Sequence, residues 1–254
     1  MLLVMDVGNT TIMIGVYDGE KRLAAWRLAT LRGRTVDEYG VLARGLFDLA
    51  RLDLASVDAM IVSSVVPPLN PVIEEMGKVY MGRQPLFVEP GVKTGMPVLT
   101  ENPHEVGADR IVNGVAAFAR WGGPVIVMDF GTATTFDVVS ARGEYLGGAI
   151  APGIGISSEA LFEKAARLPR VAVRRPPRVI GRNTVHSMQS GLYFGYAGLV
   201  EGIVRRIKEE LVEPARVVAT GGLSKTLADE MPFVEAFDPF LTLEGLRLVY
   251  LKNI

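Results

Sequence analysis

A strand-and-turn motif that occurs twice constrains the fold of this chain more than any other feature. Residues 3–11 read LVMDVGNTT and residues 126–135 read IVMDFGTATT. Each copy is an apolar run that ends in Met-Asp and is followed by glycine and by hydroxyl-bearing residues. After each copy come a second β-rich run, a glycine turn at Gly19 or Gly143, and a third run. Because chance explains two matching contexts poorly, the repeat predicts a duplicated domain.

The rest of each half alternates helical spacing with short apolar runs, which predicts an α/β fold. The predicted helices cover 34–51, 103–121, 184–212 (as one helix or two) and 241–252, and the predicted buried strands cover 59–67, 85–90 and 216–222. A Trp-Gly-Gly-Pro break at residues 121–124 predicts two domains, 1–120 and 121–254. A basic, proline-containing segment at 168–182 is expected to be an exposed loop, either solvated or in contact with a ligand.

The composition excludes several kinds of chemistry. The 254 residues include no cysteine and only two histidines, which removes disulfides, thiol nucleophiles and His-rich metal sites. Hydrophobic residues make up 49%, enough to build a core, and the net charge of −1 gives no footprint for nucleic acid or an anionic membrane. No apolar run approaches the ~20 residues of a membrane span, and Asp6 arrives too early for a signal peptide. We therefore expect a cytoplasmic globular protein.

The two repeated turns have the chemistry of polyphosphate sites. Gly8 lets the backbone approach an anion, and the Thr10 and Thr11 hydroxyls can donate to phosphate oxygens. Asp6 is itself anionic, so a cation such as Mg²⁺ must stand between it and a phosphate. The second copy offers Asp129 as a ligand for another cation, with phosphate contacts from Gly131, Thr132, Thr134 and Thr135. The alternative is a pair of ordinary β-turns, and neither a GxxxxGK[ST] loop nor a GxSxG elbow is present.

The segment NPHEVGADR, residues 102–110, is the third informative stretch. Its Asn-Pro-x-Glu start suits a helix on which Glu105, Asp109 and Asn113 would share one polar ridge. Gly107 would cost about 1 kcal/mol inside that helix, so it indicates the close approach of another group. A carboxylate held near a substrate hydroxyl can act as the general base of phosphoryl transfer. The alternative is an exposed helix face on which carboxylates pair with Arg110.

These residues together resemble a known family. The paired Asp-x-Gly turns look like the phosphate motifs of the acetate kinase–sugar kinase–Hsp70–actin superfamily. Its members have two duplicated ribonuclease-H-like (actin-like ATPase) α/β domains, with mixed sheets flanked by helices. The whole chain is similar to type III pantothenate kinases through MDVGNTT, SSVVP, NPHEVGADR, MDFGTATTFD, GGAIAPG, ATGG and DPFLTLEGL, in that order. The resemblance implies ATP-dependent phosphorylation of pantothenate to 4′-phosphopantothenate, the first committed step toward coenzyme A.

Residue roles follow from this resemblance, motif by motif. The implied nucleotide-binding residues are Asp6, Val7, Gly8, Asn9, Thr10, Thr11, Ile12, Met13 and Thr132. The implied pantothenate-binding residues are Gly107, Ala108, Asp109, Arg110 and Thr184. Asp109 would be the general base toward the primary hydroxyl of pantothenate. The resemblance also implies Mg²⁺ with ATP, and a monovalent cation, K⁺ or NH₄⁺, held by Asp129. Gly221 and Gly222 would pass near the adenosine.

The resemblance further implies a homodimer whose pantothenate pocket lies at the subunit interface. The predicted helix 184–212 agrees with this, because it carries more apolar residues than one buried stripe requires. These residues are Met188, Leu192, Phe194, Tyr196, Leu199, Val200, Ile203 and Val204. The alternative is a helix that is buried on both sides within its own domain.

Two other functions are open from the sequence. One is a non-catalytic regulatory member of the same family, and Asp6, Asp109 and Asp129 argue against it because a binding module need not keep three carboxylates. The other is a different enzyme of the superfamily, such as another small-molecule kinase, and the GADR motif argues against it. One position departs from the family: Thr100 stands where a pantothenate-contacting tyrosine is common. Either another residue covers the pocket or pantothenate affinity is altered.

Overall fold

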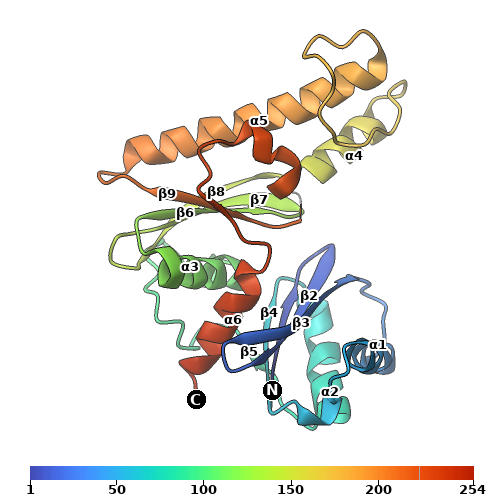
Figure 1. The fold of residues 1–254 in the computed structure, drawn as a ribbon, viewed down its shortest axis with the longest axis vertical. Coiled ribbons are helices and arrows are strands. Elements are labelled where there is room, and N and C mark those ends of the chain that lie inside the picture. The colour runs from blue at the N-terminus through green and yellow to red at the C-terminus, as the bar shows by residue number, and fades with distance from the viewer. Residues whose placement is uncertain (223) are drawn as a thin grey trace. The chain divides into compact units, whose positions relative to one another are not determined.

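The computed structural model describes residues 1–222 and 224–254, which form two compact units (Figure 1). Unit 1 comprises Met1–Met96, Asn102–Ala116 and Leu241–Ile254, and unit 2 comprises Pro97–Glu101 and Ala117–Phe240. These units differ from the single division predicted near residue 120. The C-terminal helix α6 (Leu241–Leu251) belongs to unit 1, because it packs against the first strands of the chain.

Unit 1 is built on a mixed sheet with the strand order β3-β2-β1-β4-β5. The strands are β1 (Leu2–Val7), β2 (Thr11–Asp18), β3 (Lys21–Ala29), β4 (Ala59–Ser64) and β5 (Leu86–Phe87). The first three form an antiparallel meander, and β4 and β5 continue the sheet in parallel with β1. Gly19, at the tip of the second hairpin, has φ +57°, as its turn requires.

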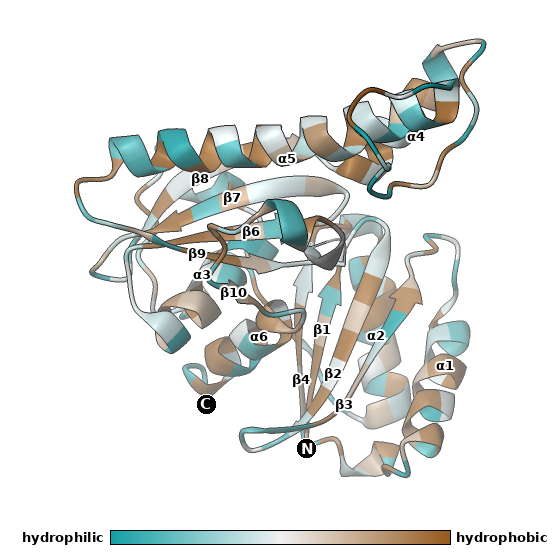
Figure 2. Ribbon diagram, turned by 45° about the horizontal axis from the view of Figure 1, so that its top comes forward, coloured by the Kyte–Doolittle hydropathy of each residue, from teal (hydrophilic) through white to brown (hydrophobic). Residues whose placement is uncertain are grey.

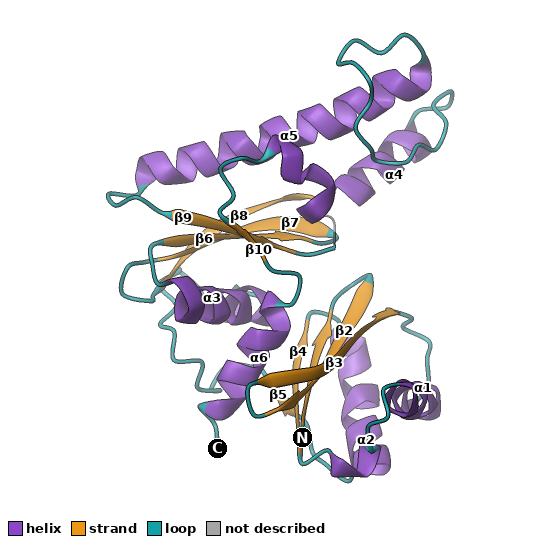
Figure 3. Ribbon diagram, viewed as in Figure 1, coloured by secondary structure: helices purple, strands orange, loops and turns teal. Residues whose placement is uncertain are grey.

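Helices cover both faces of the unit 1 sheet (Figure 3). The α1 (Val36–Leu49) and α2 (Asn70–Met81) helices pack on the face that carries Leu3 and Met5, in the core of this unit. Side chains alternate along β1, so Val4 and Asp6 point to the opposite face, where α6 packs on β1 and β2 and a Cβ on Gly15 would collide with Leu243. Short 3-10 turns occur at Leu54–Ser56, Pro67–Leu69 and Pro103–Glu105.

Unit 2 repeats the same sheet, in the order β8-β7-β6-β9-β10. Its strands are β6 (Val125–Phe130), β7 (Ala133–Val139), β8 (Tyr145–Pro152), β9 (Arg216–Thr220) and β10 (Ala236–Phe237). Its helices are α4 (Ile154–Lys164) and α5 (Thr184–Glu210), with a 3-10 helix at Ser224–Glu230. Helix α3 (Ala108–Trp121) begins in unit 1 and ends in unit 2.

The duplication extends to fine detail of the backbone. In each sheet the first strand pairs antiparallel with the second and parallel with the fourth. A β-bulge interrupts the second hairpin at Val16/Tyr17 in unit 1 and at Val138/Val139 in unit 2, the same number of residues beyond each turn. The predicted fold, two duplicated ribonuclease-H-like domains with mixed sheets flanked by helices, is therefore confirmed.

The region 184–212 forms one continuous helix, α5, which lies along the unit 2 sheet and alternates apolar and polar residues along its length (Figures 1 and 2). Tyr196, Val200 and Val204 are buried against this sheet. Leu199 and Ile203 are partly buried on the same core. Much of the apolar excess on this helix is thus used within unit 2.

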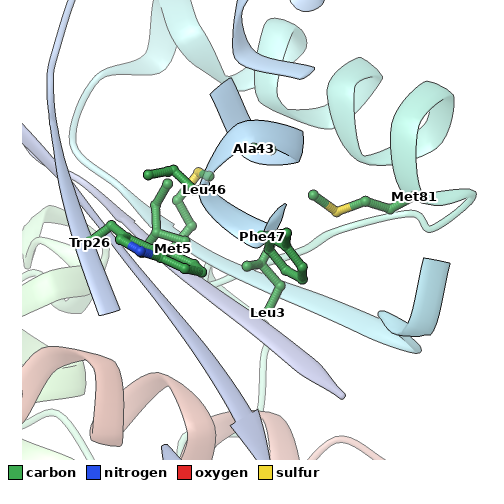
Figure 4. A pocket seen from close by; sticks show the side chains of 8 residues that line it. Leu3, Met5, Trp26, Ala43, Leu46, Phe47 and Met81 are labelled. Carbon is green, nitrogen blue, oxygen red and sulfur yellow. The ribbon is translucent and has the colours of Figure 1, made fainter. Parts of the chain in front are cut away.

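A small cavity lies in the apolar core of unit 1, lined by side chains from β1, β2, β3, α1 and α2 (Figure 4). Among its lining residues are Leu3, Met5, Trp26 and Phe47. Its volume of about 10 Å³ is no more than one water molecule needs, and its lining offers a water no polar partner. It is therefore a packing gap in the core and not a ligand site.

Candidate active site

Backbone hydrogen bonds fix the conformation of the turn between β1 and β2. Gly8 N–H donates to the Thr11 carbonyl (3.1 Å), and Thr30 N–H, just beyond β3, donates to the Thr10 carbonyl (3.0 Å). The Thr30 hydroxyl also donates to the Gly8 carbonyl (2.7 Å). With the turn tied to the third strand in this way, Asn9, Thr10 and Thr11 are exposed. Their exposure leaves them accessible to the anion that the sequence predicts at this turn.

Two members of the predicted nucleotide set are core residues. Val7 and Ile12 are fully buried and pack in the apolar core of unit 1. Val7 and Ile12 are paired across β1 and β2 on either side of the turn, so their buried side chains anchor the two ends of the turn in the core. Asp6 and Met13 are only partly buried and lie opposite one another in the adjacent pair.

The equivalent turn in unit 2 is one residue shorter. Phe130 pairs with Thr134 across it, whereas Val7 pairs with Ile12 in unit 1. Gly131 N–H donates to the Ala133 carbonyl (3.0 Å), and Gly153 N–H donates to the Thr132 carbonyl (3.0 Å). A side chain at position 153 would collide with the carbonyl oxygens of this turn, which explains its glycine.

Two hydroxyls predicted to contact phosphate in this second turn are used inside unit 2. Thr134 is buried and its hydroxyl is hydrogen-bonded to the hydroxyl of Tyr196, which also donates to the Pro152 carbonyl (3.2 Å). The Thr135 hydroxyl donates to Asp137 (2.9 Å), a buried carboxylate that also accepts from Tyr145 (2.7 Å). The prediction that Thr134 and Thr135 contact phosphate is therefore wrong. Thr132, at the exposed tip, is the residue of this turn placed to meet a ligand.

Asp129 ends β6 in a partly buried position beside Gly221. Gly221 has φ +90°, and a Cβ there would collide with Asp129 Oδ1 (2.6 Å) and with the Phe130 backbone, so this position requires glycine. Asp129 also pairs with Thr135 and Thr220 on the two neighbouring strands. Within residues 1–222 and 224–254, no three His, Asp or Glu side chains converge as a metal cluster.

The segment before α3 differs from the single helix predicted over 103–121. Pro103–Glu105 forms a separate 3-10 turn, in which the Asn102 side chain donates to Glu105 (2.8 Å). Helix α3 begins at Ala108, and the Gly107 carbonyl accepts its first hydrogen bonds. Asp109 therefore lies in the first turn of a helix and not in its middle. The predicted polar ridge is shorter, because Glu105 lies outside α3.

Gly107 is explained by the side chain that folds back over it. A Cβ at this position would lie 2.6 Å from Asp109 Oδ1. The same oxygen accepts a hydrogen bond from the Arg110 backbone N–H (2.9 Å). The approaching group that the glycine predicted is thus the Asp109 carboxylate. Asn113, one turn later, is buried and accepts from Thr242 of α6 (2.7 Å), so its role is structural.

Burial raises the pKa of the Asp109 carboxyl above its ordinary value of 3.8. The hydrogen bond from Arg110 N–H and the Arg110 charge oppose this shift, as does the positive end of the helix dipole, but desolvation is the largest cause. A raised pKa makes a carboxylate a better proton acceptor, which suits a general base. The geometry and the pKa direction both agree with the predicted role.

The remaining predicted substrate residues lie in both units. Gly107, Ala108 and Arg110 surround Asp109 at the start of α3, in unit 1. Thr184 is the exposed first residue of α5, in unit 2. Its helix is capped by Asn183, whose side chain accepts from His186 N–H (2.8 Å). Thr100, also in unit 2, has a buried hydroxyl with no hydrogen-bond partner among the described residues, so that a ligand could use it.

Three residues that position the turns were not predicted as site residues. Thr30 and Gly153 close the two turns from the ends of β3 and β8, and Tyr196 supports the second turn from α5. The repeat could have identified the first two. When the two copies are aligned at the ends of their third strands, Thr30 and Gly153 occupy equivalent positions. No sequence signal marks Tyr196, whose partners are 62 and 44 residues away.

Two glycine turns that follow an aspartate at the ends of equivalent strands define a protein of the duplicated actin-like ATPase class. The model of the family "Type III pantothenate kinase" matches residues 2–206. A type III pantothenate kinase of Geobacter sulfurreducens is 56% identical, covering 100% of this chain and 99% of the relative. One of Myxococcus xanthus is 57% identical with the same coverage. The chain belongs to the type III pantothenate kinase family.

A solved structure from Campylobacter jejuni, titled as a Baf family transcriptional activator, has the same fold. Its TM-score is 0.62 at 18% identity, covering 99% of this chain and 98% of the other. At this identity the likeness concerns the fold alone. Within the described residues, no helix is both long and apolar enough to cross a membrane.

The raised pKa of Asp109 predicts a stability cost. Between the ordinary aspartate pKa and the raised value, the folded protein holds a proton that the unfolded chain has lost, so stability falls as pH rises through this window. Asp109→Asn should therefore raise the free energy of unfolding at neutral pH relative to wild type. Below the ordinary aspartate pKa the difference should shrink. Urea unfolding at several pH values measures this, and an equal difference at every pH would contradict burial as the main cause.

Proposed function

We propose that this protein phosphorylates pantothenate with ATP to give 4′-phosphopantothenate and ADP, the first step of coenzyme A biosynthesis. The observation that carries the proposal is identity above half, over the whole chain, to relatives named type III pantothenate kinase. A non-catalytic regulatory role is disfavoured, because the protein with a regulatory title shares only 18% of its residues. Another small-molecule kinase activity is disfavoured because the relatives carry the pantothenate kinase name.

Asp109 would start the reaction. Its carboxylate takes the proton of the primary hydroxyl of pantothenate while that oxygen attacks the γ-phosphorus of ATP, and the bond to ADP breaks. Burial supports this role because it raises the pKa of Asp109, and the Arg110 N–H holds one carboxylate oxygen in place. Gly107, Ala108, Arg110 and Thr184 would orient pantothenate.

The Gly8–Thr11 turn and Thr132 would bind the nucleotide phosphates through backbone N–H groups and hydroxyls. Asp6 would contact the phosphates through Mg²⁺, which supplies charge neutralisation when bound with ATP. Asp129 would hold K⁺ or NH₄⁺ through its carboxylate, near the end of β6. That cation would offset the repulsion between Asp129 and the polyphosphate.

We expect Asp109→Asn to lower kcat by about 10²–10⁴, because asparagine keeps the volume of the side chain but cannot accept the hydroxyl proton. A coupled assay with ATP and pantothenate measures the rate, and ATP binding by calorimetry shows that the fold is intact. The acid limb of the wild-type rate profile should lie above the ordinary aspartate pKa. A variant that keeps most of its turnover would show that Asp109 only positions the substrate. A wild-type protein without activity on pantothenate would refute the proposed function.

The cation proposal predicts a dependence on the monovalent ion. Replacing K⁺ and NH₄⁺ by Na⁺, with Mg²⁺ kept, should reduce the rate by roughly tenfold or more, and Asp129→Ala should be inactive in every salt. The rate is measured at constant ionic strength, with a choline salt as the reference. Equal rates in Na⁺ and K⁺ would remove this proposal.

We also propose a homodimer formed through α5. Gly191, Gly195 and Gly198 lie at helical spacing on one exposed face of α5, and no atom lies within 4 Å of where their Cβ atoms would be. Each glycine costs a helix about 1 kcal/mol relative to alanine, so three on one exposed face favour the close approach of a second backbone. Tyr196 is unsuitable for testing this, because it is buried within unit 2.

Gly195→Leu should therefore produce monomers, because the added side chain blocks close approach without touching the core. We expect it to keep ATP binding and lose pantothenate binding, as measured by light scattering and separate calorimetric titrations. Gly45→Leu, at an exposed glycine in the middle of α1 with equally open space around it, is the matched control and should stay dimeric. A wild-type protein that is monomeric at micromolar concentration yet fully active would contradict the proposal.

A further inference from the structure

The first copy of the duplicated fold has a connection that the second copy lacks. Thr30 and Gly153 are equivalent, because each follows the third strand and donates its backbone N–H to the tip of the adjacent turn. After Gly153 the helix α4 begins at once, whereas residues 31–35, LRGRT, separate Thr30 from α1. The second copy folds without this connection, so the sheet does not require it.

This connection is braced at both ends. Thr30 is tied to the turn through both its N–H and its hydroxyl. The Leu31 carbonyl accepts from Arg34 N–H (3.2 Å) and from the Tyr39 hydroxyl (3.4 Å). Thr35 then caps α1 in a reciprocal capping box with Glu38. The backbone of Arg32, which lies within this connection, is therefore held in a defined position beside the turn.

The Arg32 side chain reaches the tip of the turn. Its Nη2 donates to Asn9 Oδ1 at 3.5 Å, which is the long limit of a hydrogen bond. The acceptor is neutral, and both residues are exposed. No ion pair of Arg32 occurs in the part of the chain that the structure describes. Arg34 differs, because it donates to the Ala29 carbonyl (3.4 Å) and lies over the Tyr39 ring.

The two turns themselves lack positive side chains. The sequences DVGNTTIM (6–13) and DFGTATT (129–135) each contain one carboxylate and no lysine or arginine. A triphosphate is strongly anionic, so the site gains from a fixed cation at this position in addition to bound metal ions. An arginine is suited to this task, since its guanidinium is always charged and its planar fork matches phosphate oxygens.

We propose that Arg32 donates to the terminal phosphate oxygens of the nucleotide bound on the Gly8–Thr11 turn, exchanging its weak bond to Asn9 for charge-assisted bonds. The proposal rests on the proposed function, because it names a further residue of the same nucleotide site. It makes Arg32 the source of the positive charge that the turn lacks, held in place by Thr30.

The test is calorimetric titration of Mg²⁺-ATP into the full-length protein, without pantothenate. Arg32→Ala and Arg32→Gln should each weaken ATP binding roughly tenfold to hundredfold, as expected for the loss of hydrogen bonds to a charged group. Arg32→Lys keeps the charge but not the fork, so it should recover part of the affinity. In steady-state assays the KM for ATP should rise while the KM for pantothenate stays unchanged.

Arg34→Ala is the matched control, because this arginine lies two residues away and its side chain bonds the Ala29 carbonyl and lies over the Tyr39 ring instead of reaching the turn. It should bind ATP within about twofold of wild type. Unchanged ATP affinity in Arg32→Ala would overturn the inference while leaving pantothenate kinase activity intact. A wild-type protein that binds ATP but does not phosphorylate pantothenate would refute the proposed function alone. A wild-type protein that does not bind ATP would overturn both.

Discussion

A single backbone hydrogen bond, present in both copies, holds the candidate nucleotide site together. The residue that follows the third strand donates its N–H to the tip of the turn between the first two strands, from Thr30 to Thr10 and from Gly153 to Thr132. This hydrogen bond fixes the turn tip to the sheet, so that the N–H groups and hydroxyls of the turn keep one orientation. Preorganised donors of this kind need no reorganisation when an anion binds, which supports the proposed phosphate site at the turn of unit 1.

The two copies use this shared frame differently. In unit 2 the hydroxyls of Thr134 and Thr135 turn inward, to Tyr196 and Asp137, and rigid packing supports the turn. In unit 1 the turn keeps Thr10 and Thr11 exposed and receives a connection that carries arginines. A duplicated scaffold can therefore present exposed turn hydroxyls beside a connection with two arginines in one unit, and a turn whose hydroxyls are bonded internally in the other. Asp109 adds a third element, a carboxylate whose burial costs stability and favours proton acceptance.

Local patterns predicted most of the fold because they report local geometry. Apolar runs that end in Met-Asp identified β1 and β6, and glycines at hairpin tips identified turns that adopt positive φ. The α2 and α4 helices were not predicted, and the helix expected from residue 103 begins at Ala108. There a strong Asn-Pro-x-Glu start signal belongs to a 3-10 turn, and α3 begins only after Gly107, whose missing Cβ leaves room for the Asp109 carboxylate.

The sequence by itself determined the duplication, the strand that leads into each turn, and the placement of Asp6 and Asp129 near the ends of the two equivalent strands. Only the tertiary structure decided which hydroxyls face a ligand, that α6 completes unit 1, and that the Arg32 side chain reaches Asn9. The reason is physical. Periodicity and turn chemistry act between near neighbours in the chain, whereas a hydroxyl chooses between solvent and a partner such as Tyr196 only after the sheet register and helix packing have brought distant segments together.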